Sequence, residues 1–330
     1  MWDSLPRPFF VLAPLDDVTD VVFREMVAQA GPPHVFFTEF TNVDALFSKG
    51  RAATLPRLYF TANQRPIVAQ FWGVKPDNFY RAAQLAAELG FDGLDINMGC
   101  PDKNVRKAGA CSALIDNRPL AAEIIAATKA GAPHLPLSVK TRLGVKTLQT
   151  EDWIGWLLEQ KLAAITIHAR TVLEMSNVPA HWDEVGRAAL LRDRHARGTY
   201  IIGNGDVMSL AEARERAAQY GVDGVMIGRG IFRNLWFFNP DQDMQRLPAA
   251  KRLNLLQKHV ELFEHTWGER KNPATMKKFL KMYISDFAGA AALREHLMAA
   301  ATLPELRALI EARMPQRAKA TTITGYGPAL

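Results

Sequence analysis

The chain has 330 residues, a length that suits one large α/β barrel with a small appendage better than a single domain of average size. Hydrophobic residues make up 48% of the sequence and charged residues 22%, which excludes extensive disorder, and two cysteines do not make a disulfide framework, although one bridge remains open. No stretch approaches the ~20 apolar residues of a membrane helix, and the first residues lack the order of a signal peptide, so we expect a cytoplasmic protein without a membrane partner.

The net charge of +6 is unevenly distributed along the chain. Residues 241–330 hold 14 Lys and Arg against 9 Asp and Glu, an excess of +5, whereas residues 1–240 hold 26 against 25, an excess of +1. A basic C-terminal quarter suggests a polyanionic partner, with a solvated basic surface as the alternative interpretation.

Short apolar runs rich in β-branched and aromatic residues recur along the first 230 residues, each followed by a polar turn and a stretch with helical spacing. The eight runs are 8–14, 34–40, 66–73, 93–99, 135–142, 164–170, 199–205 and 223–229. Helices are expected between them, for example over 75–90 and over 209–220 behind the N-cap Ser209. This alternation predicts a parallel sheet, and eight units predict a (β/α)₈ TIM barrel rather than an open sheet of five or six strands.

Polar or special residues stand at the carboxyl end of nearly every run. They are Ala13 with Pro14, Glu39, Gln70, Asn97 with Cys100, Lys140 with Arg142, His168 with Arg170, Asn204 with Asp206, and Arg229. A barrel directs all these ends to one mouth, where we expect the functional site.

From about residue 250 only helical spacing appears. Helices are expected from about 250 to a stop at Trp267-Gly268, and over about 274–285, 289–300 and 303–313. We therefore predict a barrel domain over 1–240, a small all-α helical bundle over 241–316 and a flexible tail over 317–330. A lysine cluster within the bundle is not explained by its core: Lys271, Lys277, Lys278 and Lys281.

Two glycine-containing motifs end the last two runs, GNGD at 203–206 and IGRG at 227–230. Small residues let backbone N–H groups approach an anion, and the loops after strands seven and eight often hold a phosphate in barrels. The motifs together predict a phosphate site for a cofactor or a substrate. No metal site is expected.

Three further residues are candidates for chemistry. Lys140 can stabilise negative charge on a reduced ring, or form an ion pair at the rim. His168 can be a neutral hydrogen-bonding group or a general acid. Cys100 lies on a Gly-Cys-Pro turn at the mouth, and a thiol with an ordinary pKa of about 8.5 can serve as an acid, whereas Cys111, among small residues, is assigned to packing.

The motifs APLDDVTD, TEF, AQFWG, DINMGCP, VKTRLG, IHART, GNGD and IGRG occur in this order over residues 11–230. The series resembles the signature of the tRNA-dihydrouridine synthases, and the helical region is similar to the tRNA-binding domain of their bacterial members. The resemblance implies an FMN-dependent oxidoreductase that reduces the C5=C6 bond of uridines in tRNA, with NADPH as reductant. It is expected to act as a monomer.

In the implied mechanism, hydride passes from N5 of reduced FMN to C6 of a flipped-out uracil, and Cys100 gives a proton to C5 from the opposite face. The resemblance also assigns roles at the flavin and at the RNA. Flavin-binding residues are Ala13, Pro14, Gln70, Lys140 and His168, with Asn204, Gly205, Asp206, Gly228 and Arg229 at its phosphate end. Asn97 is expected to orient the uracil, Arg142 and Arg170 to face the tRNA, and Lys277, Lys278 and Lys281 to bind it.

The chain departs from the family pattern in three places. Asp16-Asp17 stand where a small residue and Gly are common, Cys111 replaces a small residue, and the loop over 172–182 replaces one that normally carries Tyr and Gly and grips the base.

The sequence is also compatible with two other functions. One is an FMN barrel that reduces a small molecule, in the manner of a dihydroorotate dehydrogenase or an ene-reductase, which the basic helical extension disfavours. The other is a non-catalytic tRNA-binding barrel, which would need no thiol at the mouth. Uptake of FMN would separate the two enzyme hypotheses from the non-catalytic barrel. Salt-dependent binding of tRNA would separate the synthase from the small-molecule reductase.

Overall fold

The computed structural model describes residues 1–313. The tail expected over 317–330 and the last three residues of the expected helical bundle, 314–316, lie outside the described part of the chain.

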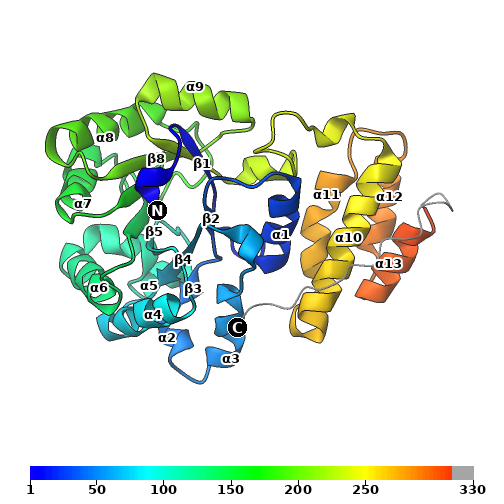
Figure 1. The fold of residues 1–330 in the computed structure, drawn as a ribbon, viewed down its shortest axis with the longest axis horizontal. Helices are drawn as coiled ribbons and strands as arrows, with labels where there is room; N and C mark the ends of the chain where they lie inside the picture. Colours follow the sequence, from blue (N-terminus) through cyan, green and yellow to red (C-terminus); the bar gives the residue numbers. More distant parts are fainter. Residues whose placement is uncertain (314–330) are drawn as a thin grey trace.

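Eight parallel strands close into a barrel in the described chain, which confirms the predicted fold (Figure 1). They are β1 (Phe9–Leu12), β2 (Phe36–Phe37), β4 (Ile67–Trp72), β5 (Gly93–Met98), β6 (Leu137–Arg142), β7 (Ala164–His168), β8 (Tyr200–Asn204) and β9 (Gly224–Ile227). Each predicted run contains one of them. β1 pairs with β9, and a parallel bridge between Val11 and Val35 joins β1 to the segment that leads into β2. A ninth strand of two residues, β3 (Thr41–Asn42), pairs with the end of β4 and was not expected.

Alternation along the strands separates the barrel interior from the layer that packs on the helices. Val11, Phe37, Ile202 and Met226 belong to an apolar cluster inside the barrel, while their neighbours in sequence pack outward. On β5 and β6 the interior positions are polar, and the register sets Asp95 against Ser138 and Asn97 against Lys140. The barrel interior therefore changes from apolar to polar on the way to the carboxyl ends of its strands.

Helices surround the barrel. The main ones are α1 (Val21–Ala30), α4 (Pro76–Glu88), α6 (Arg118–Gly131), α8 (Trp182–His195) and α9 (Leu210–Tyr220). Shorter ones are α2 (Val43–Leu46), α3 (Arg51–Thr54), α5 (Lys103–Lys107) and α7 (Gly155–Glu159). α4 buries Phe79 and Ala82, as its spacing predicts, and Ser209 caps α9 by accepting a hydrogen bond from Glu212 N at 3.1 Å.

The C-terminal region is helical and lies beside α1 (Figure 1). It contains α10 (Ala249–Trp267), α11 (Leu280–Tyr283), α12 (Ala290–Met298) and α13 (Leu303–Glu311). The helix expected over 274–285 is instead a 3₁₀ helix over Pro273–Phe279 that continues into the short α11. Phe279 stacks on Phe23 of α1 with ring centroids 4.9 Å apart, so the region shares a core with the barrel. Over residues 1–313 we find no helix with the length and apolarity needed to cross a bilayer.

Candidate functional site

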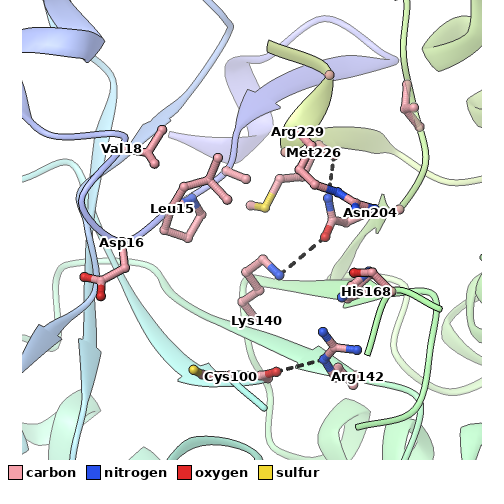
Figure 2. A pocket seen from close by; sticks show the side chains of 18 of the residues that line it. Leu15, Asp16, Val18, Cys100, Lys140, Arg142, His168, Asn204, Met226 and Arg229 are labelled. Atoms are coloured by element: carbon pink, nitrogen blue, oxygen red, sulfur yellow. Dashed lines mark hydrogen bonds between the residues drawn. The ribbon is translucent and has the colours of Figure 1, made fainter. Parts of the chain in front are cut away.

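A cavity of about 440 Å³ opens at the carboxyl ends of the strands (Figure 2). Its volume is within the range of small-molecule and cofactor sites. Twelve of the residues to which the sequence assigns a catalytic or binding role line it: Ala13, Pro14, Asn97, Cys100, Lys140, Arg142, His168, Asn204, Gly205, Asp206, Gly228 and Arg229. Gln70, Arg170 and the three lysines of the helical region do not.

The loop that carries Cys100 is held by hydrogen bonds on both sides of the thiol. Gly99 N and Cys100 N both donate to Asn97 Oδ1 at 3.0 Å, and the Cys100 carbonyl accepts from Ser112 Oγ at 2.7 Å. Arg142 Nε donates to Gly99 O at 2.9 Å. The thiol thus stands at a defined place on the cavity wall.

Cys111, in the 3₁₀ helix Cys111–Asp116, lies against Cys100 although it was assigned only to packing. A hydrogen bond from its thiol lowers the pKa of Cys100 to about 7, a larger effect than that of burial, which acts in the opposite direction. Burial and the same hydrogen bond raise the pKa of Cys111. Cys111 is fully buried and has a φ of 52°, in the left-handed region that non-glycine residues rarely adopt. A cysteine among small residues gave no local sign of this contact.

Positive charge gathers along one wall of the cavity. Burial lowers the pKa of Lys140 to about 8, and nearby Arg142 acts in the same direction. Burial, followed by the charges of Arg142, Lys140 and other cations, lowers the pKa of His168 well below its usual value, so its imidazole is neutral at pH 7. Of the two roles open for His168, the structure favours the neutral hydrogen-bonding group.

Residues after β8 and β9 form the part of the wall suited to an anion. Lys140 Nζ donates to Asn204 Oδ1 at 3.4 Å, and Asn204 Nδ2 donates to Met226 O at 2.8 Å. Gly205 has a φ of 135°, and a Cβ on it would lie 3.0 Å from Ala180 Cβ, so the close approach needs glycine. Arg229 is more than half exposed and faces this region.

Asp206 anchors cations in this region, which a phosphate-binding role would not require. Its carboxylate binds Arg170 and accepts from Ala180 N at 3.0 Å and Arg229 Nη2 at 3.4 Å. A carboxylate repels a phosphate, so Asp206 would contribute to a phosphate site only through Arg229, which it holds in position.

Arg170 and Gln70 lie behind the cavity wall. Arg170 is 2% exposed, and its guanidinium binds Asp206, His168 Nε2 and Val178 O. Gln70 is fully buried, and its side chain bonds to Asp95 and Asn97. Burial and these bonds leave the Arg170 guanidinium without an exposed surface, so the expected direct contact of Arg170 with RNA is wrong.

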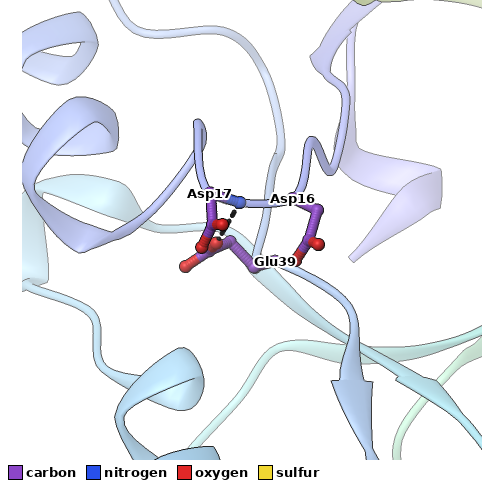
Figure 3. Close-up of side chains that lie close together, drawn as sticks. All are labelled: Asp16, Asp17 and Glu39. Carbon is purple, nitrogen blue, oxygen red and sulfur yellow. Dashed lines mark hydrogen bonds between the residues drawn. The ribbon is translucent and has the colours of Figure 1, made fainter. Parts of the chain in front are cut away.

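The departure at Asp16-Asp17 forms a cluster with Glu39, in which the carboxylate atoms lie within 4.8 Å of one another (Figure 3). Cations already balance it. Arg57 Nη1 lies 3.2 Å from Glu39 Oε1 and pairs with Asp16, while Arg57 Nη2 pairs with Asp17. Lys271 Nζ lies 3.7 Å from Glu39 Oε2. The cluster is an ion-pair network between the barrel mouth and the helical region.

The lysines predicted to bind RNA have different surroundings. Lys277 Nζ donates to Met298 O at 2.7 Å, and Lys278 Nζ donates to Asp17 O at 3.4 Å, beside the cavity mouth. Lys281 is exposed on α11.

The loop over 172–182 reaches the cavity through Ser176. Arg142 Nη1 donates to Thr171 O at 2.9 Å and to Met175 O at 3.0 Å, so Arg142 connects this loop to the Cys100 loop. Two large apolar side chains, Leu173 and Met175, are exposed on the loop.

Comparison with known proteins gives one consistent relationship. The family model described as Dihydrouridine synthase (Dus) matches residues 11–319. A protein of Bacillus subtilis (strain 168) named Probable tRNA-dihydrouridine synthase 2 is 45% identical over 313 residues, which are 94% of this chain and 95% of that protein. A Probable tRNA-dihydrouridine synthase of Staphylococcus aureus (strain COL) is 43% identical over 324 residues, or 96% and 98% of the two chains. Among solved structures, 2-naphthoyl-CoA reductase in complex with 2-naphthoyl-CoA is 10% identical with a TM-score of 0.56, over 72% of this chain and 52% of that chain, a likeness of fold alone.

Proposed function

This chain belongs to the dihydrouridine synthase family, and from that premise we propose that it reduces the C5=C6 bond of uridines in tRNA with FMN as cofactor and NADPH as reductant. The observation that carries the proposal is a thiol on the wall of a cation-lined barrel cavity. Cys100 contributes the thiol, and Lys140, Arg142 and Arg229 contribute the charges.

The residues present fit a flavin nucleotide. Arg229 and the glycines Gly205 and Gly228 offer charge and close backbone approach to a phosphate, and neutral His168 and cationic Lys140 offer hydrogen bonds to a polar ring edge. Ala13 and Pro14 would pack on the ring. Bound FMN would supply the hydride that is added to C6 of the uracil.

Cys100 would give the proton to C5. Its pKa of about 7 is suitable for a proton donor near neutral pH, because catalysis by an acid is most effective when its pKa lies near the working pH. The hydrogen bonds at Gly99, Cys100 and Ser112 keep the thiol in one place, which favours transfer to one carbon of a bound ring.

Asn97 and Arg142 would bind the uracil. Asn97 Nδ2 has two hydrogens and donates one to Gln70 Oε1 at 3.0 Å, so the other is available to a carbonyl oxygen in the cavity. Nε and Nη1 of Arg142 donate to backbone carbonyl oxygens, and its Nη2 would donate to a ligand. A uridine must leave its stack to enter such a cavity.

The helical region would hold the rest of the tRNA. We propose that Lys281 and Lys278 contact phosphates, because Lys281 is exposed and Lys278 lies at the mouth. The ammonium group of Lys277 donates to Met298 O, so Lys277 is expected to contribute less to tRNA binding.

Purified protein tests the proposal directly. We expect bound FMN, reduction of uridine in tRNA with NADPH, and loss of most turnover in Cys100→Ala with flavin content and tRNA affinity retained. A colourless protein that takes up no FMN would contradict both flavin readings. Turnover of a small molecule without salt-dependent tRNA binding would instead favour a small-molecule reductase.

A further inference from the structure

A carboxylate is buried below the cavity floor, and nothing in the proposed reaction uses it. Asp95 on β5 is 0% exposed and does not line the cavity. Burial raises its pKa from 3.8 to about 7, although two hydrogen bonds act against this rise. Burial of an ionisable acid costs free energy, and acids with such raised pKa values occur often beside functional sites.

Hydrogen bonds connect Asp95 to the loop of Cys100 without a gap. Asp95 Oδ1 accepts from Ser138 Oγ at 2.6 Å, and Asp95 Oδ2 accepts from Gln70 Nε2 at 2.7 Å. Gln70 Oε1 then accepts from Asn97 Nδ2 at 3.0 Å. Asn97 Oδ1 accepts from the backbone N–H groups of Gly99 and Cys100, both at 3.0 Å.

The chemistry of the two ends fixes the direction of every bond between them. An ionised Asp95 can only accept, so Gln70 turns its N–H toward Asp95 and its carbonyl toward Asn97, and a protonated Asp95 keeps one oxygen that can accept from Gln70 in the same arrangement. Backbone N–H groups can only donate, so Asn97 must turn its carbonyl toward Gly99 and Cys100. The orientations required from the two ends agree, which leaves one arrangement for both amides.

We propose that Asp95 is a positioning residue, which acts through Gln70 and Asn97 to hold the Cys100 loop and the free N–H of Asn97 in the geometry needed for proton transfer. The importance given to Cys100 rests on the proposed function. Without an acceptor at Asp95, the Gln70 amide would be buried with an unpaired N–H, and Asn97 would lose a fixed neighbour on one side.

Two substitutions at Asp95 separate positioning from simple loss of charge. Asp95→Leu removes both acceptors at similar size. Asp95→Asn keeps the acceptor that Gln70 needs, because its Oδ1 can accept from Gln70 while its Nδ2 donates to Ser138 Oγ and Ser138 Oγ donates to Leu94 O, 3.1 Å away. The opposite orientation of Asn would turn Gln70 around and set two donors against each other. We therefore expect Asp95→Asn to rescue what Asp95→Leu loses.

Thr166→Val is the matched control. Thr166 is equally buried on β7, and its Oγ1 has no hydrogen-bond partner in the described residues, so removing the hydroxyl breaks no bond. It is not part of the cavity wall.

The first measurement is the rate of iodoacetamide alkylation of Cys100 against pH in the flavin-loaded protein, with the modified peptide identified by mass spectrometry. Asp95→Leu should shift the midpoint of this titration by at least half a pH unit, while Asp95→Asn and Thr166→Val should leave it unchanged. Because the assay needs neither tRNA nor turnover, it reports on the hydrogen-bond chain even if the proposed reaction fails.

The second measurement is steady-state reduction of tRNA. We expect Asp95→Leu to lower kcat at least tenfold with KM for tRNA and flavin content within twofold of wild type, and Asp95→Asn to stay within threefold in kcat. Wild-type alkylation and kcat in folded Asp95→Leu would overturn the proposal, as would equal losses in Asp95→Leu and Asp95→Asn. If Asp95→Leu does not fold, Asp95→Ser, whose hydroxyl is too short to reach Gln70, decides by the same two measurements.

Discussion

Replacing Asp95 by Asn should make the protein more stable at pH 8 than at pH 5, relative to wild type. The folded protein raises the pKa of Asp95 from 3.8 to about 7, so it binds this proton more tightly than the unfolded chain does. The stability contributed by the bound proton is present at low pH and is lost as pH rises toward 7. Asn resembles the protonated acid in shape and hydrogen bonding, and it has no proton to lose.

The size of the effect follows from the shift. One pKa unit corresponds to about 1.4 kcal/mol, so a rise of about three units costs the folded wild type up to about 4 kcal/mol above pH 7. Because only Asp95 differs between the two proteins, titrating groups that do not interact with it cancel in the difference, and Lys140, which does interact with it, has a pKa of about 8 and stays charged over most of the range from pH 5 to 7. The difference in unfolding free energy should grow by about 1.4 kcal/mol per pH unit between pH 5 and 7, and stay constant above that range.

Urea unfolding at pH 5, 6, 7 and 8, followed by tryptophan fluorescence, measures this difference. Thr166→Val provides the control, because it changes a buried polar side chain that does not titrate. A stability difference between Asp95→Asn and wild type that is independent of pH would refute the reasoning, since it would mean that Asp95 titrates at the same pH in the folded and unfolded chains.

Three further changes test other parts of the structure. Cys111→Ala removes the thiol that donates to Cys100, so the alkylation midpoint of Cys100 should move from about 7 toward 9, and an unmoved midpoint would contradict the hydrogen bond. Lys271→Met should lower the unfolding free energy by about 2–3 kcal/mol in urea, because Asp20 and Glu39 stay buried, whereas a loss below about 0.5 kcal/mol would show that Arg24 and Arg57 balance these carboxylates without Lys271. Lys281→Ala should weaken tRNA binding several-fold, lower the slope of log affinity against log salt concentration by about one, and leave flavin content unchanged. Identical slopes in the variant and wild type would make Lys281 a solvated surface residue.

The strands of the barrel could be predicted from the sequence because each depends on a local pattern. Every apolar run contains a strand, and most of the polar residues at the ends of the runs line one cavity, with Glu39, Gln70 and Arg170 as exceptions. The short β3 and the π-helix over Thr150–Ile154 could not be predicted, since two paired residues and one extra residue per turn leave no periodic signal.

The partners of the site residues were much less predictable. His168 ends β7, whereas Arg170 comes two residues later, where the chain has already turned, so its side chain is buried against Asp206 and Val178 and does not line the cavity. The contact between Cys100 and Cys111 and the pairing of Asp20 with Lys271 depend on how distant segments pack. Lys271 and Asp20 are 251 positions apart, and no local spacing records such a pair.

The connection between β1 and α1 limits how this protein can be recombined with its relatives. Leu15 and Asp16 line the cavity, while Asp20, four residues on, caps α1 and accepts from Trp267 Nε1 at 2.8 Å and Lys271 Nζ at 2.9 Å. A chimaera that takes its helical region from another family member must therefore bring a tryptophan and a lysine to these two places. Otherwise Asp20 is left buried without its partners, so the barrel and the helical region of one protein have to be exchanged together.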